Sequence, residues 1–176
     1  MSFIFEAIKN NDLKALKKAL KENPSADDLA GALRNASEKD HIKQVKCLID
    51  AGARDDWAIV AAASFASIKT VRLLYERISG DLNAALIGAA AHGRLEATRF
   101  LLTTQVSVLD EALADAALRG YRDIVELLLE KGGDPWAEVY GGHTAAELAL
   151  KRGRDDITAL FEKIRGRNGK FFDGDG

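Results

Sequence analysis

The chain has 176 residues, a length that fits one domain with a sizeable hydrophobic core. Its composition is 47% hydrophobic and 30% charged with only 2 Pro, which is typical of a well-packed chain and excludes a disordered one. The 25 Lys and Arg residues against 27 Asp and Glu residues leave a net charge of -2, which disfavours a phosphate backbone as the main ligand.

Three features of the sequence indicate a cytoplasmic protein. Cys47 is the single cysteine and has no partner for an intramolecular disulfide, which favours a reducing compartment. The first residues, Met1 to Glu6, lack the basic region and the long apolar stretch of a signal peptide. No segment approaches about 18 uninterrupted apolar residues, so we expect no membrane span.

Six segments of similar pattern follow one another, and each reads as a helix, a short turn and a second helix. In chain order they cover 3–24, 28–53, 56–75, 81–102, 110–134 and 142–164. Their turns fall at Asn11, Asp40, Ala66, Gly93, Gly120 and Gly153. Gly, Asn and Asp tolerate the left-handed conformation in which a helix commonly ends. Ala66 does not, so we expect its turn to be built differently.

The apolar residues of each segment form one stripe on the first helix and another on the second. In 110–134 the two stripes are Ala112, Leu113, Ala116 and Ala117, then Ile124, Val125, Leu127 and Leu128. No helix pair buries such stripes alone, so stability has to come from stacking of neighbouring pairs. The lysines at 14, 17, 18 and 21 and the charged residues of 151–156 are the polar outer faces expected of terminal repeats.

These segments resemble the ankyrin-repeat family over about 1–165. The resemblance is carried by the alanine pairs at 62–63, 89–90 and 116–117 and by the outer helices that contain 71–74 and 124–129. It implies an all-α solenoid of about six stacked helix-turn-helix repeats within a single domain, 1–168. The approximate repeats are 1–27, 28–55, 56–80, 81–109, 110–141 and 142–168, followed by a flexible tail at 169–176.

The spacing of the turns departs from the family. Successive turns lie 29, 26, 27, 27 and 33 residues apart, whereas ankyrin repeats have a period of about 33. The resemblance therefore implies that most of the family's β-hairpin fingers are truncated and that one full finger remains, at 133–142. The Thr-Pro-Leu-His motif is reduced to Thr144, and we expect Asp28, Asp56, Asp81 and Asp110 to cap the inner helices instead.

The resemblance also implies where a partner protein binds, namely the concave face formed by the ends of the inner helices and the finger. The corresponding residues are Phe65, His92, Leu118, Arg119, Trp136, Tyr140, His143, Lys151 and Arg152. We expect the aromatic side chains to anchor the partner, and Arg119, Lys151 and Arg152 to steer towards an acidic patch on it. The structural alternatives are that Trp136 packs under its finger and that Phe65 fills the turn at Ala66.

No group of residues predicts catalysis, a cofactor or a metal ion. His41, His92 and His143 are far apart and occupy different positions in their repeats, so we expect no metal site. Cys47 lies on the apolar face of an outer helix and is interpreted as a packing thiol. The glycine-rich stretch 141–144 lacks the spacing and the lysine of a phosphate-binding loop.

The sequence therefore predicts a non-catalytic, monomeric protein-interaction module that acts as an inhibitor, an immunity protein, or a scaffold or chaperone. Two alternatives stay open. One is an accessory subunit or regulator of an enzyme with a small-molecule site. The other is a nucleic-acid or membrane-surface binder that uses the lysine-rich segment 14–21, although we expect neither nucleic acid nor membrane as the partner.

Overall fold

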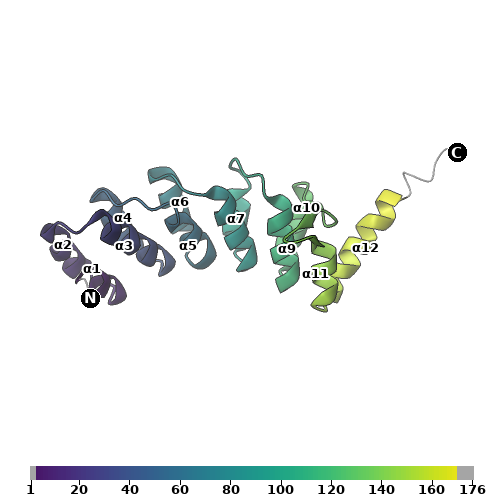
Figure 1. The fold of residues 1–176 in the computed structure, drawn as a ribbon, viewed down its shortest axis with the longest axis horizontal. Helices are drawn as coiled ribbons and strands as arrows, with labels where there is room; N and C mark the ends of the chain where they lie inside the picture. Colours follow the sequence, from purple (N-terminus) through teal and green to yellow (C-terminus); the bar gives the residue numbers. More distant parts are fainter. Residues whose placement is uncertain (1–2, 170–176) are drawn as a thin grey trace. The chain divides into compact units, whose positions relative to one another are not determined.

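The structure is a computed structural model that describes residues 3–169. The chain divides into two compact units, Met1–Val106 and Ser107–Gly176. Within the described residues, the first unit contains four helix pairs, and the second contains two pairs and a short β-hairpin (Figure 1). The predicted all-α class built from helix-turn-helix repeats is confirmed. The tail predicted at 169–176 lies outside the described residues apart from Gly169, which ends the last helix.

The four pairs of the first unit each join an inner helix to an outer helix. The inner helices are α1 (Phe3–Lys9), α3 (Ala26–Glu38), α5 (Ala58–Phe65) and α7 (Leu82–Ala91). The outer helices are α2 (Leu13–Ala19, extended by a 3-10 turn at Leu20–Glu22), α4 (Ile42–Asp50), α6 (Ile68–Arg77) and α8 (Leu95–Leu101). Each inner helix packs on the next inner helix and each outer helix on the next outer helix, so the unit has two layers (Figure 1).

The second unit repeats this arrangement with two pairs. The inner helices are α9 (Leu109–Arg119) and α11 (Ala145–Lys151), and the outer helices are α10 (Arg122–Glu130) and α12 (Asp155–Gly169). Between α10 and α11 the chain forms a hairpin of β1 (Glu138–Val139) and β2 (His143–Thr144). The strands are antiparallel, with Glu138 opposite Thr144 and Val139 opposite His143.

Alanines on the inner helices allow the repeats to approach closely. The pairs at 62–63, 89–90 and 116–117 have no exposed surface. Larger side chains fill the space between the layers, and those with almost no exposure include Leu33, Leu48, Leu74, Leu86, Leu101 and Leu113. The helices α5 and α7 are so close here that a Cβ on Gly88 would lie 2.5 Å from Ser64 Oγ.

Five of the six predicted turns contain a left-handed residue at the expected position. The φ angles are 52° at Asn11, 56° at Asp40, 70° at Gly93, 86° at Gly120 and 64° at Gly153. At the sixth turn Ala66 is extended, with φ -96° and ψ -178°. The carbonyl oxygens of Phe65 and Ala66, left without helical partners, accept hydrogen bonds from the Arg94 guanidinium of the next repeat. The expectation of a different turn at Ala66 is therefore confirmed.

The predicted aspartate caps are right at one inner helix and wrong at three. Asp81 caps α7, because its side chain accepts from the backbone N–H of Ala84. In α3 the cap is Ser25, and Asp28 lies inside the first turn. Asp56 does not cap α5, which begins after Trp57 without a side-chain cap. Asp110 lies inside the first turn of α9, where its carboxylate accepts from the backbone N–H of Asp134.

Candidate functional site

The predicted finger is a hairpin with a tight glycine tip. Gly141 and Gly142 connect β1 to β2 with φ angles of 73° and 87°, a conformation that few other residues adopt at low cost. The hairpin runs directly into α11, where Thr144 and Glu147 form a capping box. Within the part of the chain that the structure describes, these are the only two strands. The other repeats are four to seven residues shorter than the ankyrin period of about 33, so their connections have too few residues for a hairpin.

Tyr140 connects the tip of the finger to the inner helix α9. Its hydroxyl donates a hydrogen bond to Asp115 Oδ2 at 3.1 Å, and 51% of the residue remains exposed. Partial burial raises the pKa of the Tyr140 hydroxyl well above its usual value, and the negative charges of Asp115 and Glu111 raise it further. The tyrosine is therefore held in a neutral, hydrogen-bonded state with much of its surface accessible.

The base of the finger is held by two aspartates. Asp134 Oδ1 accepts from the backbone N–H of Trp136 at 2.9 Å, and the N–H of Asp134 donates to Asp110 Oδ1 at 2.7 Å. Trp136 is half-buried, so it packs in part against the fold and keeps an accessible part. On the other side of the hairpin, His143 is exposed, and its Nδ1 lies 3.9 Å from Glu147 Oε2.

Exposed cations lie where the inner helices of the second unit end. Arg119 is the last residue of α9, Lys151 is the last residue of α11, and Arg152 follows it. All three side chains are exposed, and none forms an ion pair within the described residues. Leu118 is half-buried, and its carbonyl accepts from Arg154 Nε at 3.3 Å. The C-terminal ends of α9 and α11 thus present exposed cations, and α9 packs on both α11 and β1 of the finger.

Phe65 and His92 come together in the first unit. Phe65 ends α5, His92 follows α7, and their ring centroids lie 4.6 Å apart in an edge-to-face arrangement. The His92 Nδ1 is 2.8 Å from the carbonyl oxygen of Gly88, which fixes the imidazole against its own helix. Phe65 remains 49% exposed, so it does not fill the Ala66 turn. The pair forms an aromatic surface across two adjacent repeats.

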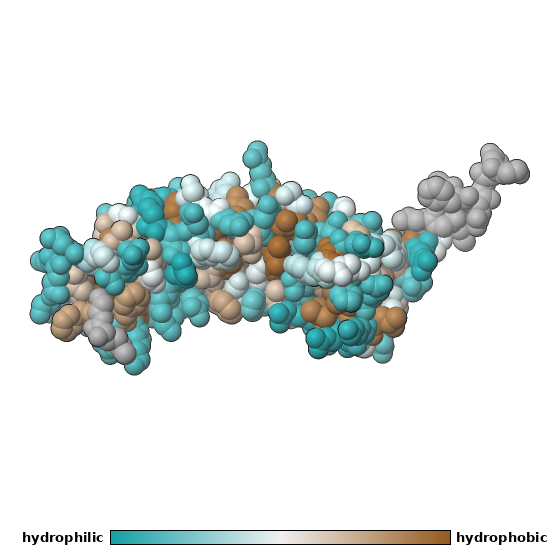
Figure 2. All heavy atoms as spheres, viewed as in Figure 1, coloured by the Kyte–Doolittle hydropathy of each residue, from teal (hydrophilic) through white to brown (hydrophobic). Residues whose placement is uncertain are grey.

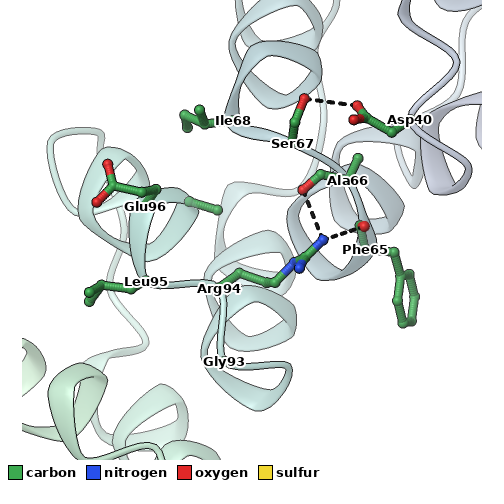
Figure 3. Close-up of a pocket in the computed structure, with 10 residues that line it drawn as sticks. Asp40, Phe65, Ala66, Ser67, Ile68, Gly93, Arg94, Leu95 and Glu96 are labelled. Carbon is green, nitrogen blue, oxygen red and sulfur yellow. Dashed lines mark hydrogen bonds between the residues drawn. The ribbon is translucent and has the colours of Figure 1, made fainter.

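A groove of about 480 Å³ lies next to this pair, between the α5–α6 turn and the α7–α8 turn (Figure 3). Two charged residues of its lining, Asp40 and Arg94, form hydrogen bonds within the fold. Asp40 accepts from Ser67 Oγ at 2.9 Å and from Thr70 Oγ1 at 2.6 Å, and Arg94 donates to the carbonyls of the Ala66 turn. The Phe65 ring points away from the side of the groove on which Leu95 and Glu96 lie (Figure 3). These contacts join neighbouring repeats.

The two units offer different surface chemistry on their inner helices. In the first unit, α5 and α7 contain no charged residue. Figure 2 correspondingly shows white and brown surface rather than teal over these two helices. In the second unit the inner-helix ends carry the cations described above. The nine predicted site residues therefore fall into an aromatic group of two in the first unit and a mixed group of seven in the second.

Three residues at these surfaces were not predicted from the sequence. Asp115 is the acceptor for Tyr140, and pairing of this kind depends on the finger's position rather than on any local motif. Trp57 is 55% exposed just before α5, and Leu150 is 68% exposed beside Lys151. A sequence signal for Trp57 existed in its spacing from an aspartate. Asp55 accepts from the backbone N–H of Trp57 at 2.7 Å, just as Asp134 accepts from that of Trp136. The Asp-x-Trp spacing is the same in both.

Neither a metal centre nor a membrane span is found in residues 3–169. No group of three or more His, Cys, Asp or Glu side chains in this range is placed to hold a metal ion. No helix in the same range is long and apolar enough to cross a membrane. Cys47 is partly buried, and this burial raises the pKa of its thiol, with Asp50 adding to the effect and Lys17 opposing it.

Comparison with known families identifies the repeats. Residues 59–139 match the family model of ankyrin repeats in three copies. The match runs from the second residue of α5 to the end of β1, so it includes Phe65, His92, Leu118, Arg119 and Trp136. No curated protein matches the chain.

Proposed function

Since this chain is an ankyrin-repeat protein, we propose that it is a non-catalytic module that binds a partner protein through its inner-helix ends and its finger. Ankyrin repeats generally mediate protein–protein interaction, and ankyrin-repeat proteins are typically non-catalytic. The observation that carries the proposal is the finger. Tyr140 is accessible and is held in a defined position by Asp115 of α9, the helix that ends at the exposed Arg119.

The finger is suited to binding because its geometry exists before any partner arrives. The capping box of Thr144 and Glu147, the Asp134 turn and the Tyr140–Asp115 hydrogen bond hold its two sides and its tip. A preformed surface loses little conformational entropy on association, so more of the contact energy remains as affinity. Tyr, Trp and Arg, the residue types found here, dominate binding hot spots.

The chemistry of the two groups indicates the chemistry of the partner. Arg119, Lys151 and Arg152 have no intramolecular ion pairs within the described residues, so an acidic patch would neutralise them. The uncharged helices α5 and α7, with Phe65 and His92 at their ends, favour an apolar or aromatic contact. We also propose that residues 1–168 act as a single repeat domain. One partner could then contact both the Phe65–His92 pair and the finger with the exposed cations of the second unit.

Within this proposal the protein works as a monomer in the cytoplasm, as an inhibitor, an immunity protein, or a scaffold or chaperone. These roles share one mechanism, in which a rigid surface covers part of the partner. The single Cys47 supports a reducing compartment.

The experiment is affinity capture from the native cell extract, identification of the captured protein, and measurement of its affinity for single variants. We expect Tyr140→Ala, Arg119→Glu and Phe65→Ala each to weaken binding by about tenfold or more, the effect expected of hot-spot residues. Matched controls are Tyr121→Ala, at the start of the outer helix α10, and Lys131→Glu, in the exposed turn after it.

The controls should bind as the unchanged protein does. Circular dichroism has to show that all five variants are folded. Unchanged binding by Tyr140→Ala, Arg119→Glu and Phe65→Ala would contradict the proposed surface, and so would equal losses in the variants and in the controls.

A further inference from the structure

The outer helices α6 and α8 form a second surface, on the layer opposite the inner helices. Ile68, Arg72 and Tyr75 follow one another at spacings of four and three residues, so they lie on one face of α6. Glu96 and Phe100 are four residues apart and lie on one face of α8. Since α6 packs on α8, we group these five residues as one surface along the junction of the two helices, which we call the outer furrow.

The two ends of the outer furrow are defined by contacts. At one end Ile68, Leu95 and Glu96 line the groove of Figure 3, on the side away from the Phe65 ring. At the other end the Arg72 guanidinium carbon lies 4.4 Å from the centroid of the Phe100 ring. The Tyr75 ring meets the same phenylalanine edge to face, at a centroid distance of 5.3 Å and an angle of 90°. The furrow thus ends in an Arg–Phe–Tyr cluster that bridges two repeats.

This cluster is accessible. Tyr75 is 43% exposed, Arg72 is exposed, and Phe100 is half-buried beneath them. An aromatic pair with an arginine over one ring, open to solvent, is the composition of a binding hot spot rather than of an ordinary helix surface. The core position at this point of α6 is occupied by the neighbouring Leu74, which has no exposed surface.

The outer helices of this unit carry more basic than acidic residues. The outer helices α2, α4, α6 and α8 carry nine Lys or Arg and three Asp or Glu, whereas the inner helices of the same unit carry two Lys or Arg and four Asp or Glu. Of the nine, only Arg77 forms an ion pair within the described residues, with Asp50 at 2.8 Å. Figure 2 shows the hydrophilic surface over α2 at the N-terminal end.

We propose that the outer furrow and its basic surroundings bind an acidic protein segment that carries apolar side chains for the Arg72–Tyr75–Phe100 cluster. Charge complementarity selects an acidic partner. A protein segment fits better than a nucleic acid for two reasons. One face of Phe100 is covered by Arg72, so the ring is not an open platform for stacking bases. Three acidic residues, Asp50, Glu76 and Glu96, lie on the same helices as the cations. The separated carboxylates of a protein segment can be positioned away from these negative charges more easily than the evenly spaced charges of a phosphate backbone.

The test is selection from a display library of random linear peptides on the full chain, followed by affinity measurements on the enriched peptides. We expect enriched sequences that combine Asp or Glu with aromatic or aliphatic residues. Arg72→Glu and Tyr75→Ala should each weaken their binding by about tenfold, and Arg72→Gln by less. Lys9→Glu is the matched control, because Lys9 is an exposed cation at the end of the inner helix α1.

Lys9→Glu should leave peptide binding unchanged. Tyr140→Ala, at the finger, should also leave it unchanged, so this proposal and the proposed function can fail independently. Three results would overturn the inference. The first is enrichment of no peptides, or of neutral or basic ones, and the second is full binding by folded Arg72→Glu and Tyr75→Ala proteins. The third is tighter binding of oligothymidine through the same residues, which would make the surface a nucleic-acid site.

Discussion

The hydroxyl of Tyr140 donates a hydrogen bond to Asp115 Oδ2 over 3.1 Å and thereby connects the finger to α9. The two residues are 25 positions apart, and the intervening outer helix α10 packs on α9. The hydrogen bond consequently joins the two parts of one repeat that are proposed to contact a partner together. It also makes the position of the finger sensitive to the protonation state of the tyrosine.

The first prediction concerns this pH dependence. Because the folded-state pKa of Tyr140 is raised, the folded protein holds the phenolic proton more tightly than the unfolded chain does. The stabilisation is complete below the ordinary tyrosine pKa of about 10 and decreases as pH rises from there through the folded-state value. An alkaline absorbance titration of the three tyrosines should show one that ionises last.

Substitutions identify that tyrosine. Tyr140→Phe should remove the late transition. Asp115→Asn should move it to lower pH, because a nearby negative charge and the carboxylate acceptor are lost. Glu111→Gln should move it less, since Glu111 contributes only through its charge. An unshifted transition in Asp115→Asn would contradict the assignment.

The second prediction concerns Asp55, which is a buried carboxylate at the start of α5. Its side chain is only 3% exposed, accepts from Arg34 Nη2 at 2.7 Å and from the backbone N–H of Trp57 at 2.7 Å, and so joins two repeats. Asp55→Ala should lower the free energy of unfolding in urea by about 1–3 kcal/mol, because these donors lose their acceptor. The neighbouring Asp56 is exposed, and Asp56→Ala should change the free energy by less than about 0.5 kcal/mol. Equal effects would show that the buried pair contributes nothing specific.

The third prediction is a double-mutant cycle between α5 and α7. Alanine is favoured over glycine inside a helix by about 1 kcal/mol, yet Gly88→Ala should destabilise the protein. Its Cβ would lie 2.5 Å from Ser64 Oγ, so the hydroxyl would have to rotate away and lose its hydrogen bond to the Val60 carbonyl, or the two helices would have to shift apart. Ser64→Ala removes that oxygen, and the double variant Ser64→Ala/Gly88→Ala should regain most of the lost stability. Thermal unfolding of the four proteins measures the coupling, and additive effects would refute the steric explanation.

The fourth prediction compares two turn glycines with similar backbones. Gly120 and Gly153 have φ angles of 86° and 64°, so an alanine at either position costs about 1–2 kcal/mol from the backbone alone. At Gly120 a Cβ would also lie 3.1 Å from the Arg154 guanidinium, whereas at Gly153 it would meet nothing within 4 Å. Gly120→Ala should therefore be the more destabilising of the two in urea unfolding. A larger loss at Gly153 would contradict this account.

Local patterns explain why so much of the architecture could be predicted. The positions of Asn11, Asp40, Gly93, Gly120 and Gly153 follow from the small set of residues that adopt a left-handed conformation, and all five adopt it. The shortened spacing of the repeats predicted a single finger, and the hairpin lies where the longer repeat leaves room for it. The caps at Asp28, Asp56 and Asp110 were predicted wrongly, because a capping side chain has several acceptable positions near a helix start and tertiary contacts select among them.

By itself, the sequence determined the helix pairs, their turns, the buried alanine faces and the place of the finger, because each depends on residues close together in the chain. Only the tertiary structure decided which side chains meet across repeats. Asp115 lies against Tyr140, Arg94 reaches the Ala66 turn, and Phe100 lies between Arg72 and Tyr75. Each of these contacts joins elements about 25 to 28 residues apart, and the stacking of one repeat on the next sets which positions face each other.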